Sequence, residues 1–348
     1  MTRQTWTAGV AAVLFVGMAI LLAVVPVPFV TWAPGGTTDT LGNVGAEPII
    51  KVQGIQTYPT TGKLDLTTVS VTRADSHLTL PEALVSYWLP HRDTLPRNAV
   101  YAPDKSVEQV ETEEAEMMET AQDDAVVAAL RAANKPVTEM PAIASVTVGG
   151  PAHGRLAPGD LVISVDGVTT SSVESVGEQI REHTVGESVT FVVWRSRSQV
   201  TVKVATTASA TTGDSPVVGI TVATGYRYQP EISFDFGQQI GGPSAGLVFA
   251  LAIYDKITAG PLLAGQHIAG TGQITPAGVV GSIGGIQEKV AAAEDDGATV
   301  FLVPAPNCAD LAGIATDTTL VKVATLTDAI AAVRALETPG GADRTPRC

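Results

Sequence analysis

The distribution of apolar and polar residues divides the chain into segments of different character, and the first is an uncharged apolar run. From Ala8 to Val30 the chain has 23 residues without a charged side chain. A helix of that length would cross a hydrocarbon core of about 30 Å, since it rises about 1.5 Å per residue. Trp6 and Trp32 flank the run, and tryptophan prefers the two membrane interfaces. We predict a transmembrane anchor at residues 8–32, preceded by a tail at residues 1–7.

The charges around this run predict its orientation. Arg3 precedes the run, and no lysine or arginine follows it until Lys51. Because positively charged flanks stay on the cytoplasmic side, we expect a cytoplasmic amino terminus, a single span in the cell membrane, and the bulk of the chain outside the cytoplasm. A cleavable signal peptide is the rival interpretation. Its apolar core usually spans about 7–15 residues and ends at a small-residue cleavage site, which VPVPFVTWAPGG does not offer.

The next segment, residues 33–137, contains strand-like pieces and one helix. EPIIKV and KLDLTTVSVT have the composition of strands. Apolar residues recur at helical spacing between Val107 and Asn134, and six glutamates from Glu108 to Glu119 supply the opposite face. These glutamates could be read as a metal site, but a solvated helix face is far commoner. We predict a helix there and no metal.

A more regular pattern covers residues 138–206. It contains alternating strands with a Pro158-Gly159 turn and an Asp-Gly turn at 166–167, then a short helix with Ser172 as its N-cap, then a hairpin of two strands. The order strand, strand, helix, strand, strand predicts a small β-rich domain. Residues 207–216 are small and polar, and we predict that they form a linker.

Strand and helix patterns alternate from residue 217 to residue 338, and residues 339–348 read as a tail. A helix of about fourteen residues is expected from Ser244 to Thr258, and a last helix is expected with Thr327 as its N-cap. This alternation predicts an α+β or α/β domain with its own core. The whole chain is therefore predicted to be α+β, with an N-terminal transmembrane helix, a β-rich domain and an α/β domain.

Composition narrows the function classes. The chain has 348 residues, 45% of them hydrophobic, with a formal net charge of −14. An acidic chain lacks the basic surface that nonspecific nucleic-acid binding requires, so we expect no nucleic-acid partner. The two cysteines, Cys308 and Cys348, exclude a cysteine-rich metal site and leave one bridge open. The five histidines show no HExxH spacing, and no cofactor is predicted.

The candidate chemistry begins at GGPSAG, residues 241–246, where one serine, Ser244, lies among glycines before an apolar run. A Walker A phosphate loop would need a lysine close by, and none lies between Asp235 and Lys256, so ATP-independent chemistry is expected. At the start of a helix, unpaired backbone N–H groups can stabilise an oxyanion. A serine in this position is nevertheless more often an N-cap than a nucleophile, so a second residue is needed.

Two bases are conceivable for this serine. GPSAG fits the elbow of α/β-hydrolases, but His267 is the one histidine after Ser244, and Asp255 is the one acid between them and falls in the predicted helix. That esterase arrangement is weak. A lysine can also act as the base. Lys289 lies on the apolar face of a predicted helix, and burial there would lower its pKa so that a neutral amine could take the serine proton. The alternative is that the Lys289 side chain extends into solvent and has no catalytic role.

Two stretches of the sequence resemble known families. GGPAHGRLAPGDLVISVDG resembles the PDZ domains of bacterial envelope proteases, which implies that residues 138–206 capture an extended peptide at a sheet edge. GGPSAGLVFALAIYDKIT, followed by GTGQITPAGVVGSIGGIQEKVAAAEDDGA, resembles the proteolytic domain of Lon proteases. This resemblance implies that Ser244 is the nucleophile, Lys289 the general base, and Thr271 a residue that supports the lysine amine.

The combination of anchor, PDZ unit and Lon-like domain resembles small bacterial envelope proteins that lack the Lon ATPase module. In that group, residues such as YPTTGKLDLTTV contribute strands to the catalytic domain, and the PDZ unit is inserted between the two parts. The predicted function is that of a membrane-anchored, ATP-independent serine endopeptidase for unfolded or flexible envelope polypeptides. A catalytically inactive PDZ scaffold is the alternative, and self-association is left open.

Overall fold

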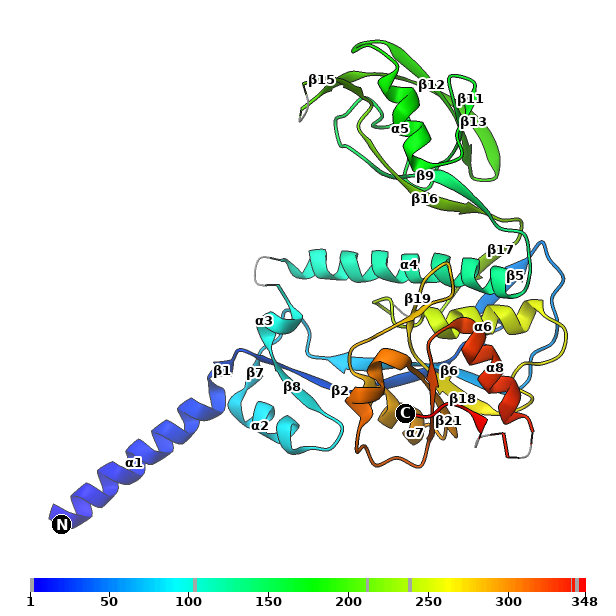
Figure 1. The fold of residues 1–348 in the computed structure, drawn as a ribbon. Coiled ribbons are helices and arrows are strands. Elements are labelled where there is room, and N and C mark those ends of the chain that lie inside the picture. The colour runs from blue at the N-terminus through cyan, green and yellow to red at the C-terminus, as the bar shows by residue number, and fades with distance from the viewer. Residues whose placement is uncertain (1–2, 103–104, 211–212, 237–239, 339, 342–343) are drawn as a thin grey trace. The chain divides into compact units, whose positions relative to one another are not determined.

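The computed structural model divides the chain into two compact units (Figure 1). The larger unit consists of Met1–Asn134 and Pro230–Cys348, and the inserted unit is Lys135–Gln229. The mixed α/β fold class is confirmed, with an apolar N-terminal helix, a small β-rich domain and an α/β domain. The structure describes residues 3–102, 105–210, 213–236, 240–338, 340–341 and 344–348.

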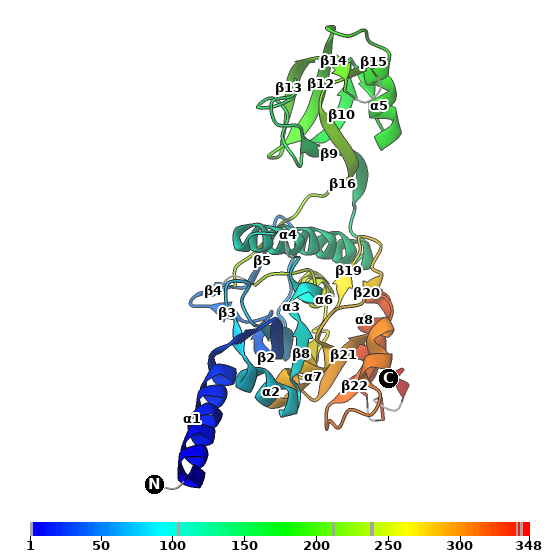
Figure 2. The ribbon, with the colours of Figure 1, turned by 90° about the vertical axis from the view of Figure 1, so that its left-hand side faces the viewer.

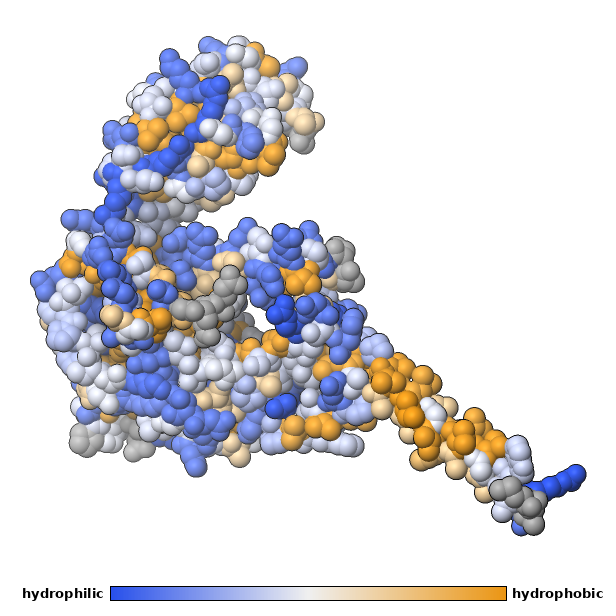
Figure 3. Space-filling model, turned by 180° about the vertical axis from the view of Figure 1, so that it is seen from behind, coloured by the Kyte–Doolittle hydropathy of each residue, from blue (hydrophilic) through white to orange (hydrophobic). Residues whose placement is uncertain are grey.

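The apolar segment forms helix α1 (Arg3–Val24), and none of its residues is buried. Within the described part of the chain it is the one helix long and apolar enough to cross a membrane, and Figure 3 shows it as an orange stalk. The helix begins and ends earlier than the predicted 8–32. Pro26 and Pro28 follow it, and proline cannot donate a helical backbone hydrogen bond, so the chain continues as a strand. Trp32 accordingly lies in that strand region and not at a helix end.

The centre of the larger unit is a six-stranded sheet with the order β22-β21-β18-β6-β2-β8. Strand β6 pairs in parallel with β18 on one side and antiparallel with β2 on the other, so the segment before the inserted unit completes this sheet. The four strands β6, β18, β21 and β22 are parallel to one another. Their bounds are β2 (Phe29–Asp39), β6 (Lys63–Val71), β8 (Asp93–Pro96), β18 (His267–Gly270), β21 (Val300–Pro304) and β22 (Thr319–Val323).

Helices cover both faces of this sheet (Figures 1 and 2). On one side lies α6 (Gly246–Ile257), which is buried along almost its whole length because its sequence is apolar on all faces, with α4 (Val107–Ala132) packed over it. On the other side α7 (Ile286–Asp295) packs on β2 and β6. The last helix, α8 (Leu326–Leu336), is capped by Thr325 and not by the predicted Thr327, because the Thr325 hydroxyl accepts the Asp328 backbone N–H in a capping box.

The remaining elements of the larger unit are short. They are β1 (Pro26–Val27), β3 (Asn43–Val44), β4 (Glu47–Pro48), β5 (Ile50–Gln53), β7 (Leu78–Thr79), α2 (Leu80–Trp88), α3 (Arg97–Val100), β17 (Glu231–Phe234), β19 (Gln273–Ile274), β20 (Val280–Gly281) and the 3-10 helix η1 (Ala305–Leu311). A disulfide joins Cys308 of η1 to Cys348. The sequence alone did not decide whether these cysteines are bonded, and the bond ties residue 348 to the larger unit.

The inserted unit contains a second sheet and one helix. The strand order of this sheet is β13-β12-β10-β9-β16, and β11 pairs with β10. Ser172 caps its helix as predicted, and the Asp-Gly pair at 166–167 makes the β10–β11 turn with both residues at positive φ. The core contains Val162, Val176 and Phe191, all fully buried. The element bounds are β9 (Thr138–Val146), β10 (Leu161–Val165), β11 (Val168–Thr169), α5 (Val173–Arg181), β12 (Ser188–Arg195), β13 (Ser198–Ala205), β14 (Thr207–Ser209), β15 (Gly213–Val217) and β16 (Ile220–Arg227).

The carboxyl boundary of the inserted unit differs from the sequence prediction. We expected a linker at 207–216 and the start of the α/β domain at 217. In the structure β14 pairs with β15, and β16 pairs antiparallel with β9, so the unit continues to Gln229. The small polar residues of this stretch hid its strands, because strand pairing depends on a distant partner more than on local composition.

Candidate active site

Ser244 lies in the loop that leads into α6, just before the N-cap residue Ala245. Its side chain is half-buried. Gly242 adopts a φ of 82°, a conformation that favours glycine, and Gly246 packs so closely on Ile274 that an added Cβ would lie 2.8 Å from the Ile274 side chain. The glycines of GGPSAG therefore serve the turn and the close packing that bring the serine to the start of the helix.

A second loop holds the serine backbone in place. The Ser244 carbonyl accepts the Gly272 N–H at 2.8 Å and the Thr271 hydroxyl at 3.0 Å. The Gly272 carbonyl in turn accepts the Leu247 N–H at 3.0 Å. Because the loop that contains Thr271 and Gly272 follows β18, these bonds tie the start of α6 directly to the central sheet.

Lys289, on the first turn of α7, completes the cluster. Its side chain is only 3% exposed. Its Nζ atom donates to Ser244 Oγ at 2.8 Å, to Thr271 Oγ1 at 3.1 Å and to the Thr67 carbonyl at 3.0 Å. The structure therefore brings together all three residues singled out from the sequence, Ser244, Lys289 and Thr271.

Burial lowers the pKa of Lys289 from its ordinary value near 10.5 to about 8. The cause is desolvation, which penalises the charged ammonium, and its three partners are a carbonyl and two hydroxyl groups, which carry no charge. A neutral amine has a lone pair and can accept a proton from the hydroxyl 2.8 Å away. The arrangement can thus activate a serine near neutral pH.

The Thr67 carbonyl is a partner that the sequence analysis missed. It lies on β6, which precedes the inserted unit, and it reaches Lys289 because α7 packs on β6. A backbone carbonyl leaves no mark in a sequence, so only the strand order could have indicated it. The carbonyl fixes the direction of the amine and leaves it aimed at Ser244.

The cluster opens into a cavity of about 1720 Å³ within the larger unit. Its lining includes both Ser244 and Lys289 and, from α4, Glu114 and Met118. The Gly242 N–H donates to the Glu114 carbonyl at 3.1 Å, so α4 also positions the serine loop. A cavity of this size has room for several residues of an extended polypeptide beside the serine.

The structure does not bring His267, the base of the esterase alternative, to Ser244. Its Nε2 lies 2.5 Å from Asp65 Oδ2, and Lys63 bridges Asp65 and Asp296 nearby. The carboxylates of this group are thus compensated by a lysine ammonium, which also repels a metal ion. Asp255 is buried and accepts the Leu262 N–H at 2.6 Å. Among the described contacts, those of Lys289 are the ones that supply Ser244 with a base.

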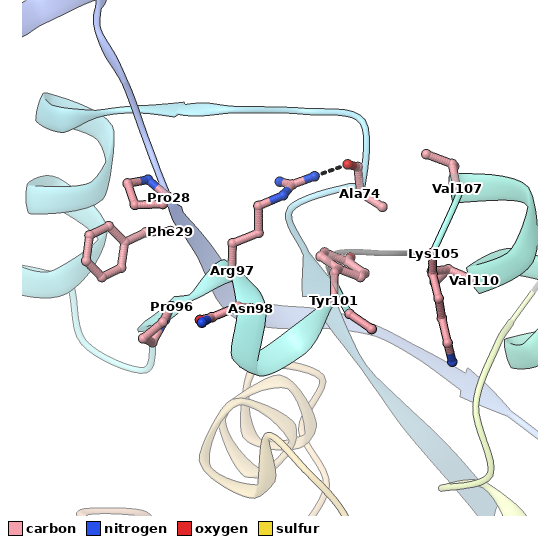
Figure 4. A pocket seen from close by; sticks show the side chains of 11 residues that line it. Pro28, Phe29, Ala74, Pro96, Arg97, Asn98, Tyr101, Lys105, Val107 and Val110 are labelled. Atoms are coloured by element: carbon pink, nitrogen blue, oxygen red, sulfur yellow. Dashed lines mark hydrogen bonds between the residues drawn. The ribbon is translucent and has the colours of Figure 1, made fainter.

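A smaller cavity of about 560 Å³ lies beside α3 in the larger unit (Figure 4). Pro28, Phe29, Arg97 and Tyr101 contribute to its lining. Arg97 donates to backbone carbonyls, including that of Ser76 at 2.8 Å, so its charge serves the local fold. None of the residues predicted for catalysis lines this cavity.

Gly285, the N-cap of α7, is expected to be essential for the placement of Lys289. It has a φ of 68°, and an added Cβ would lie 2.6 Å from Val69 Cγ2. We expect Gly285→Ala to lower the free energy of unfolding by about 2 kcal/mol or more and to reduce cleavage, measured by denaturant titration and peptide hydrolysis. Gly297→Ala is the control, because Gly297 has a φ of 85° and open space around the added methyl. It should lower the free energy of unfolding clearly less. Equal losses would contradict the packing argument.

The Thr271 hydroxyl is expected to support the lysine. Thr271→Val removes both of its hydrogen bonds in a site that is 1% exposed, whereas Thr271→Ser keeps the hydroxyl. We expect the valine variant to lose about tenfold to a hundredfold in kcat/KM and the serine variant to lose little. Equal activity of the valine variant and the unmodified protein would show that the hydroxyl has no role.

Comparison with known families places two domains on this chain. The profile of the Lon protease (S16) C-terminal proteolytic domain matches residues 239–333, which contain Ser244, Thr271 and Lys289. The PDZ domain profile matches residues 118–206. The PDZ match precedes the Lon match along the chain, and it begins 20 residues before position 138, where the sequence resemblance placed the start of the PDZ unit.

Similar proteins include Lon proteases and a PDZ domain. The Lon protease of Roseiflexus castenholzii is 44% identical over 70 residues, 20% of this chain and 8% of the relative. Lon protease 2 of Bacillus subtilis is 28% identical over 162 residues, 47% of this chain and 27% of the relative. A crystal structure of the PDZ domain of an SdrC-like protein from Listeria monocytogenes, at 26% identity and TM-score 0.23, covers 24% of this chain and 87% of that domain.

This chain therefore spans only a minor part of the length of the curated relatives that it matches. The part that matches is the proteolytic domain, and it includes the loop of Ser244 and the helix of Lys289. These findings support a serine peptidase. Residues 239–333 are thus similar to the Lon (S16) proteolytic domain, and residues 118–206 are similar to a PDZ domain.

Proposed function

We propose that this protein is a membrane-anchored, ATP-independent serine endopeptidase that uses Ser244 as nucleophile and Lys289 as general base. The observation that carries the proposal is the 2.8 Å hydrogen bond between Lys289 Nζ and Ser244 Oγ, made by a buried amine whose pKa is lowered to about 8. A nucleophile within hydrogen-bond reach of a base, with that base oriented by further groups, is the general signature of an activated serine. Here Thr271 and the Thr67 carbonyl provide the orientation.

The reaction begins when the neutral Lys289 amine takes the Ser244 proton as Oγ attacks the scissile carbonyl. The resulting oxyanion is stabilised by backbone N–H groups at the start of α6, ahead of Leu247, whose own N–H is bound to the Gly272 carbonyl. The Lys289 ammonium then gives its proton to the leaving amine, which leaves an acyl-enzyme on Ser244. Water, deprotonated by the same lysine, hydrolyses the ester and restores the serine.

The substrates that we propose are unfolded or flexible polypeptide segments. The sequence contains no GxxxxGK[ST] motif for binding a nucleotide, so no ATP-driven unfolding is invoked for this chain. The PDZ domain would select or present the polypeptide by accepting an extended strand at a sheet edge. Helix α1 would hold the protein in the membrane with its larger part outside the cytoplasm.

The proposal is tested by cleavage of an unfolded protein without nucleotide. The purified full chain in detergent is incubated with casein or a quenched fluorescent peptide, with and without ATP, beside Ser244→Ala prepared in the same way. We expect cleavage by the unmodified protein alone, unaffected by ATP. Absence of cleavage in both proteins, or the same cleavage in both, would overturn the proposal, and the first outcome would favour a PDZ scaffold.

A further inference from the structure

Helix α2 (Leu80–Trp88) has a burial pattern opposite to that of an ordinary surface helix. The residues it buries are the small Ala83 and Ser86. The residues it exposes are large and apolar, with Tyr87 at 70% and Trp88 at 73% exposure. A helix on a globular protein normally turns its large apolar side chains toward the core. The exposed side of α2, which we call the α2 apolar face, consists of Leu84, Val85, Tyr87, Trp88 and the following Leu89.

The position of this face relative to α1 is fixed by strand pairing. Strand β1 follows α1 directly, and it pairs antiparallel with β7, which directly precedes α2. Thr79 caps α2, and the Glu82 carboxylate accepts the Thr79 backbone N–H at 2.8 Å, so the start of the helix is held at the pairing point. Helices α1 and α2 are in contact, and Figures 1 and 2 show α2 beside the C-terminal end of α1.

The composition of the face suits a membrane interface. Tryptophan and tyrosine combine an apolar ring with a polar group and concentrate where the hydrocarbon meets the headgroups. Leucine and valine beside them supply the apolar area that drives an amphipathic helix into this layer. Arg92 and Asp93 follow at the exposed end of the same segment and add a polar edge that carries both signs of charge. This apolar face adjoins the end of α1, the helix for which we propose a membrane span.

We propose that the α2 apolar face lies in the interfacial layer of the same bilayer that α1 spans. This inference rests on the proposed membrane anchor. The protein then has two contacts with the membrane, one spanning and one lying on its surface, and the larger unit is held against the bilayer instead of moving freely on a single tether. The occupant of the face is lipid. The experiment must distinguish lipid from a second copy of the chain or another protein.

The test places a fluorophore at single positions of the full chain. Both native cysteines are joined in the disulfide, so an introduced cysteine can be labelled with an NBD dye. Trp88→Cys and Val85→Cys report on the face, and Phe15→Cys reports on α1. Val279→Cys, 50% exposed in the turn between β19 and β20 of the same unit, is the control. Each protein is reconstituted into phosphatidylcholine–phosphatidylglycerol vesicles that contain lipid with a doxyl quencher at carbon 5, with peptide cleavage as the check of folding.

We expect quenching at positions 85 and 88 to exceed that at 279 by about threefold or more, and to stay unchanged when the protein is diluted to about one chain per vesicle. Quenching at 15 without quenching at 85 and 88 would overturn the interfacial contact and leave the anchor standing. If dyes at positions 85 and 88 are protected from aqueous iodide, and this protection is lost on dilution, the face binds a second copy of the chain. That result would also overturn the proposal. Absence of quenching at all labelled positions, including 15, would overturn both the anchor and this inference.

Discussion

Replacement of Ser244 by alanine is expected to lower peptide cleavage by roughly 10⁴-fold to 10⁶-fold, the loss that follows removal of a covalent nucleophile. The hydroxyl is the group that Lys289 Nζ contacts at 2.8 Å, and Ser244 lines the cavity. The measurement is kcat/KM with a fluorogenic peptide, together with the free energy of unfolding from denaturant titration. Stability should change little, because the side chain is small and half-buried.

The matched control for this change is Ser282→Ala. Ser282 is an exposed serine in the glycine-rich loop before α7, and it does not line the cavity. We expect its replacement to leave kcat/KM within about twofold of the unmodified protein, as is usual for a surface substitution. A Ser244→Ala protein that keeps the activity of the Ser282→Ala protein would show that another residue is the nucleophile.

Replacement of Lys289 by methionine is expected to lower kcat by about 10²-fold to 10⁴-fold, the usual contribution of a general base. Methionine occupies a similar volume in the 3% exposed site but has no amine to accept the serine proton. Lys289→Arg should not restore the activity, because a guanidinium keeps its proton throughout the accessible pH range. The measurement is single-turnover cleavage, which separates the chemical step from peptide binding.

Two comparisons sharpen this expectation. Lys256→Met changes a half-buried lysine near the end of α6, outside the cavity lining, and should leave kcat unchanged. The double variant Ser244→Ala with Lys289→Met should be no less active than Ser244→Ala alone, because a nucleophile and its base act as a unit. A further loss in the double variant would mean that Lys289 acts independently of Ser244, contrary to the proposed mechanism.

Much of the site could be identified from the sequence, for physical reasons that differ between residues. Ser244 stood out because glycines and a proline surround one hydroxyl at the start of a helix. Lys289 stood out because its spacing places it on the apolar face of a helix. Neither pattern was decisive alone, and the resemblance to Lon proteolytic domains joined them. The Thr67 carbonyl could not be predicted, since it depends on α7 packing on β6, a contact between residues 222 positions apart.

The fold was predictable where local chemistry dominates. The apolar helix, the Asp-Gly turn at 166–167 and the Ser172 cap all depend on residues within one short stretch. The strands β14, β15 and β16 were not predicted to belong to the inserted unit, because a polar stretch becomes a strand only through its partner. The end of α1 was placed too late because the apolar run continues through Pro26 and Pro28, which stop the helix while keeping the composition apolar.

The pH dependence of kcat/KM for peptide cleavage tests the role of Lys289 most directly. Burial lowers the pKa of this amine to about 8, and the neutral form is the active base, so the rate should rise with pH and level off above pH 9 with its half-maximal value near pH 8. Below that pKa the amine is protonated and cannot accept the serine proton. A profile that is flat across this range, or that is already level at pH 7, would contradict the assignment of Lys289 as the base.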